Sequence, residues 1–235
     1  MRRLLPLAAL AVLAACSPRP QGEARTDAAV VPDTKPAAVA QPPADAPAGQ
    51  YTLDMGHTSV TFRVSHIGLS NYTSRFTKAD GKLNFDPANP AGQSVTATIE
   101  ARSLETDYPD PKLDFDALIQ KEFLDTANHP QITFKSTKVE PTGPRTARVT
   151  GDLTLKGVTR PVVLEATWNG GYKPGAMDPS GARVGFSAHG TFKRSDFGVT
   201  YGLPAPGTTM GVGDDIQVAI ETEFTMKPQP AAAGT

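Results

Sequence analysis

Hydrophobic and polar residues alternate with a period of two along most of the chain after residue 50, as is typical of β-strands. The clearest run lies near the C-terminus, where Ile216, Val218 and Ile220 alternate with polar residues. Similar runs, separated by turn residues, occupy 51–55, 60–64, 73–86, 95–99, 131–140, 145–156, 158–168 and 184–192. The pattern predicts eight or more strands, each with one face toward a core and one toward water.

One segment departs from this period and predicts a helix. Asp110 and Pro111 offer an N-cap and a proline at the first helical position. Apolar residues then follow at helical spacing: Phe115, Leu118, Ile119 and Phe123. We expect two to three helical turns, with Pro130 closing the region. A strand meander with one helix fits a closed antiparallel barrel or a sandwich, and periodicity does not separate the two.

The N-terminus predicts export. Arg2 and Arg3 precede a twelve-residue apolar run at 4–15, which is too short for a spanning helix of about 20 residues. The last part of the run, Leu13-Ala14-Ala15-Cys16, resembles a bacterial lipobox. That resemblance implies a signal peptide at 1–15, cleavage before Cys16, and attachment of lipid, including an acyl chain such as palmitate, to Cys16. We therefore expect a lipoprotein anchored in a membrane through Cys16.

The residue after the lipidated cysteine bears on location. In such lipoproteins a serine at this position, here Ser17, usually directs the product to the outer membrane. We expect a cell-envelope protein with its domain in the periplasm, the outer membrane being favoured, or on the cell surface.

Composition divides the remaining chain into three parts. Residues 17–49 hold 7 Pro and 9 Ala and no aromatic residue, too little apolar surface to offset the entropy of ordering. We predict a tether at 16–49, a folded domain at 50–228 and a disordered tail at 229–235. The tether could span on the order of 110 Å at ~3.3 to 3.6 Å per residue.

Charge and cysteine content exclude several functions. The net charge of −1 gives no basic footprint, so we expect no nucleic-acid partner. One cysteine can form neither an intramolecular disulfide nor a multi-cysteine metal site. The four histidines, at 57, 66, 129 and 189, are too far apart for a short ligand pair. No metal, no cofactor and no catalytic residues are predicted, and we expect a protein that is not an enzyme.

Four stretches resemble the YceI-like family in order and spacing. They are HTSVTFRVSHIGLSNYTSRFTKADGKLNFDP from His57, KEFLDTANHPQITFKSTKV from Lys121, GDLTLKGVTRPVVLEATW from Gly151, and FKRSDFGVTYGLPAPGTTMGVGDDIQVAIETEF from Phe192. The resemblance implies an all-β, lipocalin-like, eight-stranded extended antiparallel barrel with a short helix near its mouth. It also implies an apolar tunnel holding a polyisoprenoid, an isoprenoid quinone or a fatty acid or amide.

In such a barrel, we expect alternating strand residues to line the tunnel, with two aromatic residues near an opening. The predicted ligand-binding residues are Phe62, Val64, Phe76, Phe134, Leu153, Leu155, Trp168, Phe186, Phe192, Phe197 and Tyr201. A polar head group would need hydrogen-bond donors near strand ends. The candidates for that role are Lys156, Arg160, Lys193 and Arg194.

Three interpretations remain open at this point. The first is carriage, storage or sequestration of the lipid. The second is a barrel filled by its own side chains, acting as an envelope interaction or stress protein. The third is an enzyme acting on isoprenoid lipids, which would need a convergent polar constellation that the sequence does not indicate. The sequence also leaves open whether the domain forms a homodimer.

Overall fold

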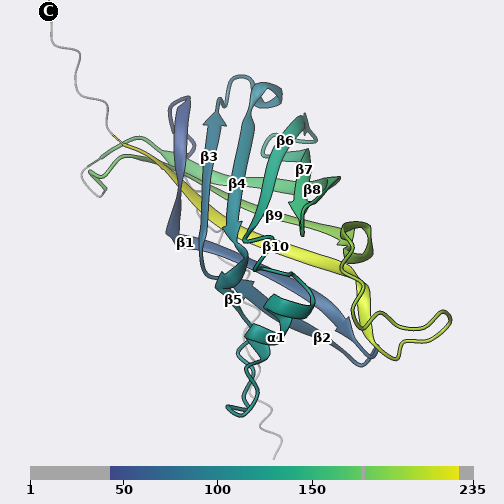
Figure 1. Ribbon diagram of the computed structural model, residues 1–235. Coiled ribbons are helices and arrows are strands. Elements are labelled where there is room, and N and C mark those ends of the chain that lie inside the picture. The colour runs from purple at the N-terminus through teal and green to yellow at the C-terminus, as the bar shows by residue number, and fades with distance from the viewer. Residues whose placement is uncertain (1–42, 176–177, 228–235) are drawn as a thin grey trace, which may run out of the picture. The chain divides into compact units, whose positions relative to one another are not determined.

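The computed structural model describes residues 43–175 and 178–227, a β-rich unit with one short α-helix (Figure 1). Its strands are β1 (Gly49–His66), β2 (Ser70–Phe76), β3 (Ala79–Phe85), β4 (Ser94–Glu100), β5 (Leu104–Glu105), β6 (Gln131–Pro141), β7 (Thr146–Leu155), β8 (Val158–Tyr172), β9 (Ala182–Lys193) and β10 (Val212–Met226). The helix α1 spans Phe115–Glu122. Short 3-10 segments are η1 (Pro90–Gly92), η2 (Ala101–Ser103) and η3 (Arg194–Phe197).

Eight of these strands close into an antiparallel barrel. Their order is β10-β9-β8-β7-β6-β4-β3-β1, and β1 pairs back with β10, for example with Val60 opposite Ile220. This pairing of the first and last strands decides between the barrel and the sandwich that the alternation left open. The predicted eight-stranded barrel with one short helix is confirmed.

Strand β1 pairs with β10 along one edge and is long enough to pair with two strands, β3 and β2, along the other. Residues 49–52 pair with β3, whereas residues 60–66 pair with β2, which in turn carries the two-residue β5. The register of β1 against β10 shifts between Asp54 and Ser59, and such a bulge bends a strand. Strands β2 and β5 thus extend the wall beyond β3 and β4 at one end of the barrel.

The two ends of the barrel carry different elements. We call the α1 end the one formed by α1, the segment 106–114 before it, the β1–β2 turn at 67–69, and the residues 198–211 that precede β10. The opposite end carries the β3–β4 and β6–β7 connections and the outer ends of β1 and β10. In Figure 1, α1 lies at the lower end of the barrel and the β3–β4 connection at the upper end.

The predicted start of the helix was wrong by one turn. The N-cap is Asp114, whose Oδ1 accepts a hydrogen bond from the backbone N–H of Ala117 (2.9 Å). Asp110 instead closes a turn, because its carboxylate accepts from the N–H of Lys112 and its carbonyl accepts from that of Leu113. The helix is therefore shorter at its N-terminus than the sequence indicated.

Fully buried apolar residues form two clusters, one toward each end. The cluster toward the α1 end includes Leu104 and Phe197, and the other includes Phe85 and Val184. Helix α1 contributes no fully buried residue and packs on the first cluster through Ile119. The strands, the 3-10 segments and the loops beside them, not the helix, therefore supply the fully buried core.

Ordered contacts begin before residue 50. Ala46 is 4% exposed and belongs to the second cluster, and Ala44 forms a parallel bridge with Gly171. The hydroxyl of Tyr51 donates to the carbonyl of Pro47 (2.7 Å), and burial raises the pKa of Tyr51 to about 12. The last residues of the predicted tether thus pack on the barrel.

Several sequence predictions fall elsewhere in the chain. The predicted signal peptide at 1–15, Cys16, the tether as far as residue 42 and the tail at 229–235 lie outside the described residues. Within residues 43–175 and 178–227, no helix is long and apolar enough to cross a membrane.

Candidate functional site

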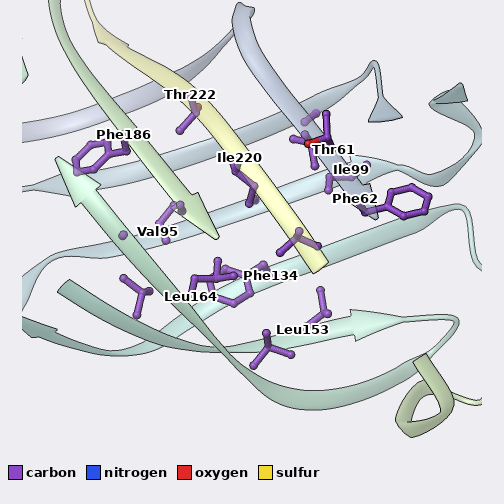
Figure 2. Close-up of a pocket in the computed structure, with 18 of the residues that line it drawn as sticks. Thr61, Phe62, Val95, Ile99, Phe134, Leu153, Leu164, Phe186, Ile220 and Thr222 are labelled. Atoms are coloured by element: carbon purple, nitrogen blue, oxygen red, sulfur yellow. The ribbon is translucent and has the colours of Figure 1, made fainter. Parts of the chain in front are cut away.

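The barrel encloses an apolar cavity of about 810 Å³, walled by side chains from every closing strand (Figure 2). Figure 2 shows Phe134, Leu153 and Phe186 projecting into this space from three different strands. A volume of this size lies within the range of about 300 to 1,000 Å³ typical of small-molecule sites. The interior is therefore not filled by its own side chains.

Small residues in register keep the cavity open. On β9, Phe186 and Ala188 line the cavity, whereas the intervening Ser187 does not. Ala188 pairs with Ala166 of β8, so two adjacent positions of the wall carry only methyl groups. The alternation of residues along each strand makes the inner face of the barrel apolar. The paired alanines leave space in the cavity because their side chains are small.

Nine of the predicted tunnel residues border this cavity. They are Phe62, Val64, Phe76, Phe134, Leu153, Leu155, Trp168, Phe186 and Phe192. The structure places the other two elsewhere. Phe197 is 1% exposed and packs edge-on against Phe192 (centroids 5.3 Å apart), behind the wall. Tyr201 is 55% exposed and lies against Phe123 on the outside of the α1 end (5.1 Å).

Of the four head-group candidates, three lie outside the cavity wall. Lys156 occupies the tight β7–β8 turn and donates to the carbonyl of Gly198 (3.3 Å). Lys193 pairs with Asp215 (3.0 Å), and Arg160 donates to the carbonyl of Thr159 (3.2 Å). Arg160 and Lys193 are exposed and Lys156 is half-buried, and all three lie at strand ends near the α1 end.

Arg194, the fourth candidate, borders the cavity and is 2% exposed. Its guanidinium group donates four hydrogen bonds of 2.8–2.9 Å, to the carbonyls of Val199, Tyr201, Val212 and Gly213. Burial lowers the pKa of Arg194 from its usual value. Most of its donors are therefore engaged in holding Val199 and Tyr201 to the first residues of β10.

Helix α1 and the segment before it cover the same end of the cavity. Ile119, Phe123 and Leu124 line it from this side, and the Arg194 guanidinium lies 5.6 Å from the centre of the Phe123 ring. Tyr108 stacks on Phe115 with centroids 4.7 Å apart and is itself 42% exposed. Tyr108 therefore borders both the cavity and the outer surface, as do exposed Pro87, Pro90 and Pro144 at the opposite end.

Sequence reasoning missed a cation at the opposite end. Arg145, in the β6–β7 turn, lines the cavity with its guanidinium 5.4 Å from the centre of the Trp168 ring. Its Nη1 donates to the carbonyl of Asn169 (3.0 Å). The only sequence signal was a cation in a Gly-Pro-Arg turn, which is also the pattern of an ordinary solvated turn.

Polar side chains in the cavity wall are few, and they differ in whether they have a hydrogen-bond partner. The hydroxyl of Thr58 donates to the carbonyl of Asp54 (2.8 Å) and lies 3.0 Å from the hydroxyl of Thr222, so both hydroxyls have partners. Ser74, 4% exposed, carries the only buried side-chain polar atom without a hydrogen-bond partner among the residues that the structure describes. A buried hydroxyl without a partner is uncommon in folded proteins.

A group with metal-ligand chemistry lies at the opposite end of the barrel. One ligand atom each from Asp54, His57 and Glu223 lies within 4.8 Å of the others. Arg183, however, donates from Nη1 to both carboxylates, at 2.7 and 2.8 Å. Its hydrogen bond to Asp54 holds the pKa of that carboxyl below the ordinary value. The guanidinium already supplies the positive charge that a metal ion would bring.

A closed eight-stranded antiparallel barrel with an apolar cavity belongs to the class of small barrels whose interior has room for one small ligand. The chain matches the YceI-like domain family over residues 51–224 and belongs to that family. It is 39% identical over 165 residues to a UPF0312 protein of Pseudomonas savastanoi pv. phaseolicola, covering 69% of this chain and 80% of that one.

Solved structures agree with the fold. The YCEI protein of Campylobacter jejuni is similar with a TM-score of 0.58 and 29% identity, over 70% of this chain and 90% of that one. A polyisoprenoid binding domain from Saccharophagus degradans has a TM-score of 0.54 at 16% identity, over 76% and 98% of the two chains. At that identity the second likeness concerns the fold alone.

Proposed function

We propose that this protein binds one long apolar lipid chain in its barrel cavity and performs no reaction on it. The observation that carries the proposal is the cavity itself: about 810 Å³, walled by apolar side chains from all closing strands. A domain of the same fold, from Saccharophagus degradans, is described as polyisoprenoid binding. A polyisoprenoid, an isoprenoid quinone or a fatty-acid or amide chain has the shape and chemistry that such a cavity accepts.

Burial of apolar surface accounts for affinity without catalysis. Removing apolar surface from water contributes about 25 cal/mol per Å². A chain that loses about 400 Å² would gain on the order of 10 kcal/mol, from which the entropy lost on binding is subtracted. The aromatic rings of Phe134, Phe186 and Trp168 supply large parts of the wall against which this chain would lie.

The α1 end is the end at which we expect the lipid to pass. The helix that covers this end, α1, has no fully buried residue, and Tyr108 borders both the cavity and the surface. Such a covering has fewer buried contacts to break than the strand walls have.

We place the protein in the bacterial cell envelope. Lipid on Cys16 would hold it to a membrane, the outer membrane being favoured, with the barrel in the periplasm or at the cell surface. There it would carry, store or sequester a lipid that is insoluble in water. The support for this placement is the signal-like run and lipobox-like motif at the N-terminus.

The sharpest test narrows the cavity without changing its polarity. Ala188→Trp places an indole in the lumen beside Ala166, and His189→Trp places the same ring on the outer face of the same strand. Full-length wild-type and variant proteins would be purified from bacteria, and the lipid in their organic extracts quantified by mass spectrometry. We expect stoichiometric lipid in the wild type and His189→Trp, and a loss of at least about tenfold in Ala188→Trp.

The magnitude follows from displaced area. If the indole displaces about 100 Å² of ligand contact, about 2.5 kcal/mol of binding is lost, more than a tenfold change. A wild-type protein that carries no lipid and takes up no added prenyl or acyl lipid would refute the proposal. Equal lipid content in the two tryptophan variants would show that lipid binds elsewhere.

A further inference from the structure

Large apolar side chains on the outside of the barrel are concentrated at one end. Within residues 43–175 and 178–227, five of six exposed ones belong to the α1 end: Leu69, Tyr108, Leu113, Tyr201 and Met210. The sixth, Val163, lies on β8. Leu69 is 85%, Met210 71% and Tyr201 55% exposed. We call these three side chains the apolar rim.

The apolar rim is held in place by contacts between its two loops. The N–H of Ile67 donates to the carbonyl of Gly211 (2.8 Å), and Gly68 packs so closely on Thr209 that a Cβ would lie 3.0 Å from it. The carbonyl of Tyr201 accepts a hydrogen bond from buried Arg194 (2.9 Å). The exposure of these side chains is therefore built into the fold.

The loops of the apolar rim carry no charge. Neither residues 67–73 nor residues 198–213 contain an Asp, Glu, Lys or Arg. The neighbouring segment 105–114 is acidic, with four carboxylates and one lysine. Exposed apolar groups on uncharged loops favour contact with a membrane surface that has no net charge. The acidic segment beside them would be repelled by an anionic membrane surface.

We propose that the apolar rim docks on a bilayer of zwitterionic phospholipid, inserting Leu69, Tyr201 and Met210 among the head groups and acyl chains. Tyr108, at the same end, borders both the cavity and the surface, so docking would bring this end of the cavity to the membrane from which an insoluble lipid must come. This inference rests on the proposed lipid-binding function, and it adds the surface through which the lipid is exchanged.

Transfer kinetics test the docking. Full-length wild type, the double variant Leu69→Ser/Met210→Ser and the control Val163→Ser would move a fluorescent polyprenyl lipid from donor to acceptor vesicles of phosphatidylcholine. The control removes an exposed apolar side chain outside the apolar rim. We expect wild-type and Val163→Ser rates to be equal and to rise with acceptor concentration. The double variant should be slower by at least about tenfold, because two interfacial side chains no longer insert.

Equilibrium loading separates the two proposals. We expect the double variant to bind the same final amount of probe as the wild type, because neither residue lines the cavity. A wild type that loads no probe refutes the proposed function, and the docking with it. Normal loading with equal transfer rates in all three proteins overturns the docking alone. Faster transfer when a third of the phosphatidylcholine is replaced by phosphatidylglycerol would also overturn it, since charge would then drive the contact.

Discussion

The buried guanidinium of Arg194 allows a quantitative test of what fixes the α1 end. Arg194→Met keeps most of the apolar length of the side chain against Phe123 but removes every donor. The carbonyls of Val199, Tyr201 and Val212 would lose their partner, as would that of Gly213 through Nε. We expect the substitution to destabilise the barrel and to loosen the residues before β10.

The size of the effect follows from the number of bonds. Four hydrogen bonds, each with a net contribution of about 1 kcal/mol, sum to about 4 kcal/mol. The cost of burying the guanidinium, visible in its lowered pKa, offsets part of this. A loss of about 2 to 4 kcal/mol in the free energy of unfolding is therefore expected, which moves the urea midpoint by about 1 to 2 M.

The control applies the same substitution to an exposed arginine. Arg148 of β7 pairs with Glu165 of β8 at 3.1 Å, and both side chains are about half exposed. Exposed ion pairs contribute about 0 to 1 kcal/mol, so Arg148→Met should barely move the midpoint. Urea unfolding of the full-length proteins, monitored by tryptophan fluorescence, gives the change in the free energy of unfolding for each of the two variants. If Arg194→Met lies within 1 kcal/mol of Arg148→Met, the four bonds do not stabilise this end as argued.

Three further substitutions probe other parts of the chain. Ser74→Ala should leave the urea midpoint unchanged or raise stability by about 1 kcal/mol, because its buried hydroxyl has no partner among the described residues. Ser103→Ala should lower stability by about 1 kcal/mol, since its hydroxyl donates to the Glu100 carbonyl and accepts from the Lys78 N–H; the reverse order would contradict both assignments. Cys16→Ser should abolish incorporation of labelled palmitate in growing cells, and a variant that still takes up label would disprove lipidation at that position.

Much of the barrel follows from local alternation, but its closure does not. On β9 and β10 every second residue faces inward, so parity alone identifies wall residues such as Phe186 and Ile220. The pairing that separates a barrel from a sandwich joins Val60 to Ile220, two residues that no local pattern relates. Strand existence is therefore readable from sequence, whereas strand partners required the structure or the family resemblance.

The helix start shows how tertiary contacts choose between equal local signals. Asp110 and Asp114 are both suitable N-caps. Thr106 donates from its backbone and its hydroxyl to Asp116, which ties the first turn of α1 to the end of β5. That contact fixes the helix one turn later than Pro111 suggested, and the sequence contains no sign of it.

The cations were the least predictable part of the site. Arg194 and Lys193 are adjacent in sequence and were equal candidates, yet one is 2% exposed and the other pairs with Asp215 at the surface. Lys193 is the last residue of β9 and faces outward by parity with Phe192, whereas parity is lost in η3, so the direction of Arg194 could not be derived. Arg145 was missed for the related reason that turns do not reveal which side chains face the lumen.

Closure by the first and last strands has a consequence for the order of events during biogenesis. Because β10 is the final strand and pairs with both β9 and β1, a chain that still lacks it is an open sheet with two unpaired edges. Pairings between residues so distant in sequence form slowly, and the inward face stays in contact with water until they do. Lipid can therefore enter a closed cavity only after the whole domain has been synthesised. A truncation before β10 leaves an open sheet with no enclosed cavity.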